Sequence, residues 1–581
     1  MEYRTSLKWL WQAGPLRRGG SLQWSVGTTT TDRFYSILCV VLVVGSVLAT
    51  VPFLEMGVND DWSYTWVARS LAVSGHFTYN AWIGAMIGVQ AWWASLLIRL
   101  FGFSFTLVRL STLPLAIGCA ILLYRLGRSV GLNPSFALFG TLSVTLSPVF
   151  IPLAASFLTD VPGFFLWLAS IYCAVRAVQT DSTSRECGWM AVAAVTGVAG
   201  GTVRQVVWLV PLLVLPAVAY IRRRTWRTNR ATVICAAALW CGSVLAIASC
   251  LSWFQAQPNV PTFPTSPGTI EDGVESLVRI ALGCLLLILP VLALHLTGWR
   301  KWTPFALAFG LLSSGALLGA LWWFEDDLLL GNIITSTGML RQGTELLGAK
   351  PEILTAPARF LLGVAVFAGG AVTAAALWDS LRWWRWLRLR QFAFLYGPAC
   401  LVYTAAILYR AVAYQVLFDR YLIVLLPALI VPLLWHFQRR IRETPPALGW
   451  VVMGLFALYG VAATHDYLAA GRARVRAATA VAATGVLRTH ISGGMEYDGW
   501  TELEQTGHVL NVSFSADPKP APHRYLVSPP YWFWAKTPSL DPAYMVTYSR
   551  LPGLVDAAFP PIQYTTWLPP FHREVFTQKA P

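Results

Sequence analysis

"FYSILCVVLVVGSVLATVPFLEMGVNDDW", residues 34–62, joins an apolar run of membrane-spanning length to two adjacent aspartates. The apolar part, Phe34 to about Leu54, is longer than the ~7 to 15 residues of a signal-peptide core, and Arg33 precedes it. We therefore expect an uncleaved anchor that enters the membrane from the cytoplasm. An ionised carboxylate is costly to hold away from water, so Asp60 and Asp61 need an explanation of their own.

The composition indicates a membrane protein. Of the 581 residues, 56% are hydrophobic and only 12% are charged, whereas about 25% are charged in an ordinary soluble domain. Further apolar runs have the length that a bilayer requires, and with a less regular run at 189–203 they bring the predicted number of spans to thirteen. They lie near 107–126, 134–152, 161–179, 206–221, 231–253, 277–297, 304–324, 358–378, 391–411, 421–437 and 448–466.

The basic residues predict the orientation of these spans. Alternating spans from a cytoplasmic N-terminus place most of the arginines in inner loops, which agrees with the positive-inside rule. The inner loops hold Arg125 and Arg128, Arg222 to Arg224 with Arg227 and Arg230, Arg300 and Lys301, Arg382 to Arg390, and Arg439, Arg440 and Arg442. The net charge of +15 therefore reflects cytoplasmic loops rather than nucleic-acid binding.

The predicted fold is an all-α polytopic membrane protein followed by a small α/β domain. Residues 1–33 form a cytoplasmic segment, 34–466 the transmembrane domain with a first outer loop at 55–106, and 467–581 a soluble domain on the outer side. Within that loop, the apolar stretch 85–103 is interpreted as a helix lying along the outer leaflet, because a further span would move the Arg222 cluster outside. In the soluble domain, "RYLVS" at 524–528 resembles a strand.

Several functions lack support in the sequence. The nine cysteines form no CxxC pair, and no Walker loop, GxGxxG after a strand or HExxH is present, so we expect no cofactor and no metal site. Glu325 to Asp327 are interpreted as a solvated loop, the alternative being a divalent cation near a lipid phosphate. The aromatic stretch at 528–538 is interpreted as core of the outer domain, the alternative being a rim facing a sugar or the membrane surface.

Ionisable groups predicted at membrane depth are functional candidates by default. The alternation of spans places acids and arginines at one level near the outer side of the membrane, which suits a phosphorylated substrate in the membrane. Guanidinium groups bind phosphate through charge-assisted hydrogen bonds, and a carboxylate can take a proton from an attacking hydroxyl. These groups are Asp60 and Asp61, Asp160, Arg204 with Gln205, and Asp419 with Arg420 and Tyr421.

The order of these motifs resembles the GT-C superfamily of integral-membrane glycosyltransferases, of the protein mannosyltransferase and aminoarabinose transferase type. The resemblance covers about 34–466 and includes Tyr64 after the acidic pair, "FGFSFTLVRLST" with Arg109, "SFLTDVP" and "DRYLIVLLP". It implies about thirteen spans, juxtamembrane helices in the first outer loop, and inverting transfer of a sugar from a polyprenyl phosphate to an acceptor on the outer side.

The resemblance also implies roles for individual residues. Asp60 would be the base that deprotonates the acceptor, with Asp61 beside it as the other candidate, and Asp160 would be a second acid of the site. Arg204 and Arg420 would hold the lipid phosphate. The remaining candidates for substrate binding are Tyr64, Arg109, Gln205 and Tyr421.

Each candidate also has a structural interpretation. Asp60, Asp61 and Asp160 could cap helices, because Asp is a favoured N-cap residue. Arg109 could be an arginine that reaches the membrane interface, which is the interpretation we favour for it, and Arg420 could be an interfacial anchor.

The expected function is therefore sugar transfer from a polyprenyl-linked donor to an acceptor that is a lipid, a glycan or a protein, at the outer face of a bacterial plasma membrane. Two other classes remain open. A flippase for polyprenyl-linked lipids would need phosphate-binding arginines but no outer carboxylate base. A membrane-anchored sensor would use the C-terminal domain as its working part. The sequence contains no readable code for the sugar or the acceptor.

Overall fold

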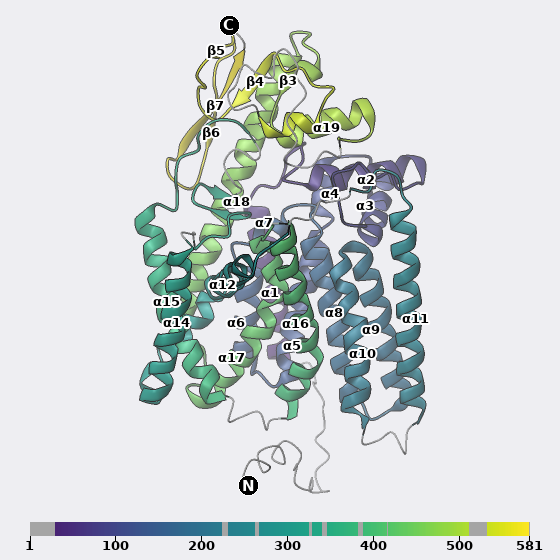
Figure 1. The fold of residues 1–581 in the computed structure, drawn as a ribbon, viewed down its shortest axis with the longest axis vertical. Coiled ribbons are helices and arrows are strands. Elements are labelled where there is room, and N and C mark those ends of the chain that lie inside the picture. The colour runs from purple at the N-terminus through teal and green to yellow at the C-terminus, as the bar shows by residue number, and fades with distance from the viewer. Residues whose placement is uncertain are drawn as a thin grey trace, which may run out of the picture.

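The computed structural model describes residues 29–223, 230–261, 267–324, 328–339, 346–380, 387–414, 416–510 and 531–579. A bundle of long helices forms one end of the molecule, and a smaller domain containing the C-terminal strands forms the other (Figure 1). Four predicted segments lie wholly or partly outside the described residues: 1–33, Glu325 to Asp327, the expected strand 524–528 and the first part of the aromatic stretch.

Every predicted span coincides with helical segments of the structure. Apolar helix formers dominate these segments, and several begin at a favourable cap, such as the Thr29 hydroxyl at the first of them. They are α1 (Thr30–Ala49), α4 (Phe105–Leu110) with α5 (Leu113–Val130), α6 (Pro134–Thr145), α8 (Asp160–Gln179), α9 (Thr183–Val203), α10 (Leu209–Ile221), α11 (Arg230–Gln255), α12 (Ile270–Leu287) with α13 (Leu289–Leu296), α14 (Pro304–Trp323), α15 (Ala356–Ser380), α16 (Leu387–Tyr414), α17 (Leu426–Arg440) and α18 (Ala447–Ala482).

Fewer spans are found when each helix must be both long enough and apolar enough to cross a membrane. Among the described residues, eight helices are long and apolar enough to cross a membrane, or nine if the pair α12 and α13, bent by 71°, counts as one span. The count of thirteen is thus not confirmed. Helices α6, α10 and α17 have 12, 13 and 15 residues, fewer than the ~20 that cross a bilayer alone. The chain is a multi-pass membrane protein.

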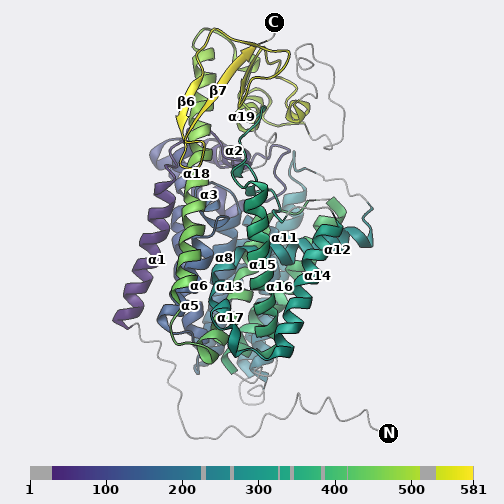
Figure 2. The same ribbon diagram turned by 90° about the vertical axis from the view of Figure 1, so that its left-hand side faces the viewer.

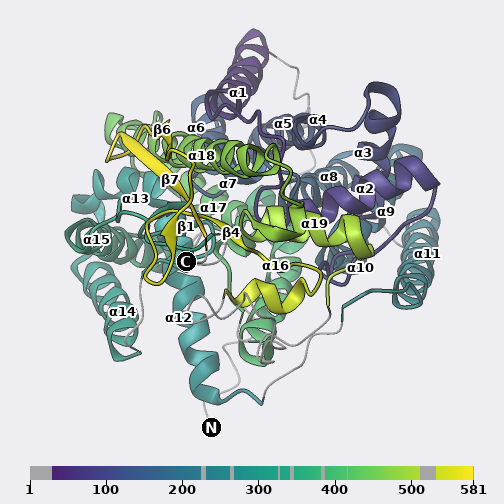
Figure 3. The same ribbon diagram turned by 90° about the horizontal axis from the view of Figure 1, so that it is seen from above.

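The segment between α1 and α5 forms two further helices, α2 (Asp61–Ser74) and α3 (Gly88–Phe101), near the end of the bundle that faces the C-terminal domain (Figure 1). Seen from above, α2 lies beside α19 (Met495–Thr506) of that domain (Figure 3). Helix α3 confirms the helix expected in the first outer loop. One side of it exposes Trp92, Leu96 and Leu100, at 54%, 49% and 64%. An exposed row of this kind is typical of a helix that lies on a membrane surface.

Helix α18 connects the two parts of the molecule. It has 36 residues, about 54 Å of helix, and runs from the bundle into the C-terminal domain (Figure 2). The domain boundary expected after residue 466 therefore falls inside a continuous helix.

The C-terminal domain contains a small mixed sheet and helix α19 (Met495–Thr506), and thus confirms the predicted α/β class. Strand order is β3-β4-β7-β5, with β3 and β4 parallel and the other pairs antiparallel, and β6 also pairs with β7. The strands are β3 (Ile491–Ser492), β4 (Tyr544–Thr547), β5 (Val555–Asp556), β6 (Ile562–Thr565) and β7 (His572–Lys579). Elsewhere, β1 (Ile334–Thr335) and β2 (Gly338–Met339) form a short hairpin, and α7 (Phe150–Ala154) precedes α8.

Aromatic packing joins the C-terminal domain to the segment between α1 and α5. Phe533 and Trp534 are fully buried, which favours the core interpretation of the aromatic stretch. Trp62 at the start of α2 packs into the same cluster, with its ring 6.0 Å from that of Phe533. The loop between α1 and α2, which carries the acidic pair and is called the acidic loop, is thereby held between the bundle and the domain.

Candidate active site

The two adjacent aspartates have different surroundings. Helix α2 begins at Asp61, and Asp60 stands at its N-cap position but its carboxylate accepts no capping hydrogen bond. That carboxylate instead accepts from the indole N–H of Trp82 (3.0 Å) and from Nη2 of Arg420 (3.2 Å), and its side chain is 20% exposed. Asp60 is therefore accessible and is paired with a cation.

Asp61 is 1% exposed and has a structural environment. Its two carboxylate oxygens accept from the backbone N–H of Val58 (2.5 Å) and of Phe157 (3.1 Å). Burial raises the pKa of Asp61 to about 6, although the charge of Arg109 and these two hydrogen bonds oppose that shift. Asp61 thus ties the acidic loop to the segment before α8.

The pKa of Asp61 leads to a prediction about stability. Because this pKa is raised on folding, the native state holds the proton more tightly than the unfolded chain, whose pKa is near 3.8. The resulting contribution is present below about pH 4 and is lost as the pH rises through about 6, an effect of about 3 kcal/mol at most. Thermal unfolding in detergent should show this decrease for the wild type. Asp61→Asn should remove that component of the pH dependence, and an unchanged profile would contradict the assignment.

The second acid of the site lies between two arginines. Asp160, at the first position of α8, accepts a hydrogen bond from Nη1 of Arg204, and its other oxygen is 3.9 Å from Nη1 of Arg420. A negative charge is favourable at a helix N-terminus, which stabilises the carboxylate there. Asp60, Arg420, Asp160 and Arg204 therefore form a row of alternating charges, and the side chains of Asp160 and Arg420 are 2% and 9% exposed.

Local backbone breaks place the two arginines in this row. Arg204 follows the last residue of α9 and has an extended backbone (φ −144°, ψ 111°), so its side chain leaves the helix toward α8. Arg420 lies in a 3₁₀ turn (Asp419–Val424) that precedes α17. Nε of Arg420 is buried and has no hydrogen-bond partner among the described residues, so this guanidinium retains a free donor.

Two tyrosines complete the cluster. The guanidinium carbons of Arg204 and Arg420 lie 4.9 and 5.9 Å from the ring centroid of Tyr421, within range of a cation–π contact. Tyr64 on α2 lies within range of the charges of both acids and both arginines of the row, and burial raises its pKa above the ordinary range. Asp60, Asp160, Arg204, Arg420, Tyr421 and Tyr64, separated by up to 361 residues in the sequence, are brought together.

Two other candidates contact the backbone outside this row. Arg109 is 1% exposed and donates to the carbonyl oxygens of Pro52, Leu54 and Met56 at 2.7 to 3.0 Å. Its guanidinium is thus engaged with the loop that follows α1 rather than with the row of charges. Gln205 donates to the carbonyl of Gly84 (2.8 Å). These contacts hold the loop between α1 and α5 in place.

The Asp419 carboxylate also contacts backbone groups rather than the row of charges. Its carboxylate accepts from the backbone N–H groups of Ile333, Ile334 and its neighbour Arg420, at 2.8 to 3.0 Å. The short hairpin of β1 and β2 is thereby fixed next to the arginine. No group of three or more His, Cys, Asp or Glu in the described part of the chain is arranged to hold a metal ion.

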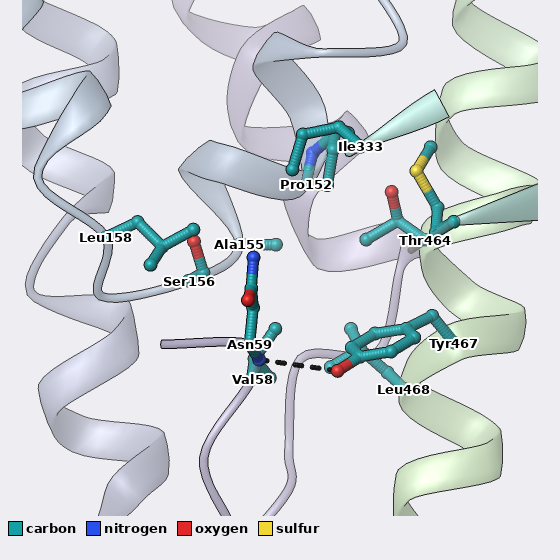
Figure 4. A pocket seen from close by; sticks show the side chains of 11 residues that line it. Val58, Asn59, Pro152, Ala155, Ser156, Leu158, Ile333, Thr464, Tyr467 and Leu468 are labelled. Carbon is teal, nitrogen blue, oxygen red and sulfur yellow. Dashed lines mark hydrogen bonds between the residues drawn. The ribbon is translucent and has the colours of Figure 1, made fainter. Parts of the chain in front are cut away.

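A small, mostly apolar cavity adjoins the acidic loop. Figure 4 shows Asn59 pointing into it between Ala155 on one side and Tyr467 of α18 on the other. The amide nitrogen Nδ2 of Asn59 is buried and has no partner among the described residues. The backbone of Asn59 has a φ of 54°, in the left-handed region that few non-glycine residues adopt.

Sequence reasoning missed two residues that contact the acidic loop. Trp82 donates to the Asp60 carboxylate, and Glu496 of α19 accepts from the backbone N–H of Asn59. A Trp in a loop, such as Trp82, and a Glu in a soluble domain, such as Glu496, have no local sequence pattern that predicts such contacts. Only a prior expectation that the C-terminal domain folds back onto the loop would have identified them.

Comparison with known proteins agrees with the expected class. Residues 88–253 match the family model described as dolichyl-phosphate-mannose-protein mannosyltransferase. This match confirms, over that part of the chain, the resemblance to GT-C glycosyltransferases inferred from the motifs. Comparison with curated proteins gave no match.

Three solved structures show a distant likeness. ArnT from Cupriavidus metallidurans is 15% identical in its apo state, with a TM-score of 0.40, and 14% identical when bound to undecaprenyl phosphate, with a TM-score of 0.41. Both alignments cover 94% of this chain and 98% of ArnT. The oligosaccharyltransferase of Archaeoglobus fulgidus is 11% identical over 77% of this chain and 58% of its own, with a TM-score of 0.38.

Proposed function

We propose that this protein transfers a sugar from a polyprenyl-phosphate-linked donor to an acceptor, with Asp60 as the general base. One observation carries the proposal: the partly exposed Asp60 carboxylate is linked through Arg420 to a buried row that contains a second arginine. A carboxylate next to phosphate-binding groups is the combination that transfer from a lipid phosphate requires.

In the proposed reaction, the acceptor oxygen or nitrogen attacks the anomeric carbon and gives its proton to Asp60. The bond between the anomeric carbon and the phosphate oxygen breaks at the same time, and its electron pair stays on the lipid phosphate. Arg204 and Arg420 stabilise the charge that develops there, and the free Nε donor of Arg420 provides one hydrogen bond. Attack from the face opposite the leaving group inverts the anomeric carbon, and phosphate needs no acid to depart.

The orientation of the helices supports an outer-face site. Arg128 lies in the last turn of α5 and Arg440 ends α17, whereas the row of charges lies where α8 begins and α9 ends. With the positive-inside rule, the arginine-rich ends are cytoplasmic and the site faces outward together with the C-terminal domain. We propose the plasma membrane of a bacterium as the location.

The function is tested with purified protein in detergent and a panel of polyprenyl phosphates that carry radiolabelled sugars. We expect time-dependent release of polyprenyl phosphate and appearance of label in a membrane-extract acceptor, which mass spectrometry then identifies. A flippase would instead move intact lipid across vesicles without releasing polyprenyl phosphate. Absence of release with every donor, together with such movement, would exclude the proposal.

A further inference from the structure

The C-terminal domain contacts the acidic loop through a buried carboxylate. Glu496 of α19 is 0% exposed, and its Oε1 accepts from the backbone N–H of Asn59 (3.2 Å) and from the hydroxyl of Tyr467 (2.7 Å). Its Oε2 forms an ion pair with Arg474 of α18 (2.8 Å), which also donates to the carbonyl of Gly493. Among the described residues, the other two hydrogen-bond partners of this carboxylate, Tyr467 and Arg474, both lie in α18.

The residue that Glu496 holds immediately precedes Asp60. A left-handed backbone in a non-glycine residue is sparsely populated and persists where surrounding contacts determine it. The hydrogen bond from the Asn59 N–H to a buried, charged acceptor is such a contact, and Figure 4 shows the same backbone group directed at Tyr467. Rotation about φ of Asn59 would swing the following carboxylate away from Arg420.

A second contact from the same domain reaches Asp60 through Trp82. The ring of Trp82 lies 5.3 Å from that of Phe533 and 6.1 Å from that of Trp532, while its indole N–H donates to the Asp60 carboxylate. The domain therefore fixes the backbone on one side of Asp60 and the carboxylate itself on the other.

We propose that Glu496 is a positioning residue: through Asn59, and with Trp82 held by the aromatic cluster, the C-terminal domain aims Asp60 at the acceptor. This inference rests on the proposed role of Asp60. A misplacement of the base by about 1 Å lowers the rate of the chemical step by up to about 100-fold while substrate binding is retained. The domain would then be part of the transfer machinery rather than an independent module.

The test compares two buried acids on the first turn of α19. Glu496→Gln removes the charged acceptor of the Asn59 N–H, whereas Asp498→Asn alters a carboxylate whose partners in the described part of the chain are Ser492, Gly493 and Trp534, all inside the domain. We expect Glu496→Gln to lower kcat by about 10- to 100-fold with the KM for the lipid donor unchanged. We expect Asp498→Asn to keep kcat within about twofold of wild type, with thermal unfolding recorded for both.

A double variant separates an effect on the position of Asp60 from an effect on protein stability. Glycine takes φ above zero and below zero about equally readily, so in an Asn59→Gly protein the Glu496→Gln change should cost much less in kcat than it does in wild type. If Glu496→Gln does not fold, Trp82→Phe removes the indole donor but keeps an aromatic ring, and it should lower kcat by about 10-fold at unchanged KM.

Failure of the positioning role can be distinguished from failure of the proposed function. If wild type releases polyprenyl phosphate and Asp60→Asn does not, the function stands. In that case, wild-type kcat in both Glu496→Gln and Trp82→Phe overturns the positioning role. Equal losses of kcat in Glu496→Gln and Asp498→Asn that follow their losses of thermal stability overturn it as well.

Discussion

Asp60→Asn is expected to lower kcat for sugar transfer by about 10³-fold, because the amide cannot take the proton of the attacking acceptor. The substitution keeps the size of the side chain, and its single amide oxygen can still accept from one of the two donors, Trp82 and Arg420, which now contact separate oxygens of the carboxylate. Binding of the lipid donor should therefore change by less than about threefold. The measurement is single-turnover release of polyprenyl phosphate, together with equilibrium binding of the labelled donor.

Asp61→Asn is the matched control for this experiment. Asp61 is buried and bonded to two backbone N–H groups, so its replacement should alter stability and its pH dependence more than the chemical step. Each variant is compared at equal folded fraction. Full transfer by Asp60→Asn, or loss of transfer only in Asp61→Asn, would transfer the role of base to Asp61.

Arg420→Lys is expected to lower kcat/KM by about 10²- to 10³-fold. Lysine keeps the positive charge but lacks the planar fork that pairs with Asp60 and Asp160 and leaves Nε free for phosphate. Because the guanidinium stabilises charge on the departing phosphate, the loss should appear in kcat as well as in KM. The same transfer assay measures it, with free polyprenyl phosphate as a competing ligand.

Arg69→Lys on α2 provides a control for the loss of an arginine near the same end of the bundle. Arg69 stacks over Trp66, Phe103 and Trp500 and makes no contact with the row of charges. We expect kcat/KM of this variant within about twofold of wild type. Equal effects of the two substitutions, or an unchanged Arg420→Lys, would contradict a phosphate-binding role for Arg420.

Much of the architecture could be predicted from local patterns. An apolar run of about 20 residues has few stable structures other than a helix in lipid, so each predicted span coincides with helical segments. The count was harder to predict, because the length of a helix depends on where the chain breaks. Thus 134–152 divides into α6 and α7, and 277–297 contains a sharp bend between α12 and α13.

The site was predictable in its residue types and less so in its contacts. Charged residues at one membrane level pointed to Asp60, Asp160, Arg204 and Arg420, and these do lie together. Arg109 was a candidate through the family resemblance, yet its guanidinium donates to three backbone carbonyls of the loop that follows α1. Both environments suit a buried arginine, so sequence patterns do not distinguish them.

The amino-acid sequence alone determined that this chain is a polytopic membrane protein with a small C-terminal α/β region and an acidic pair after its first span, because hydropathy and charge are properties of short segments. Tertiary structure alone separated Asp60 from Asp61. Neighbouring residues share one local pattern, but Asp60 meets Arg420 from 360 positions away while Asp61 meets the backbone of Phe157. It also brought Glu496, 437 positions along the chain, to the N–H of Asn59. Such contacts depend on how distant segments pack, which no local pattern encodes.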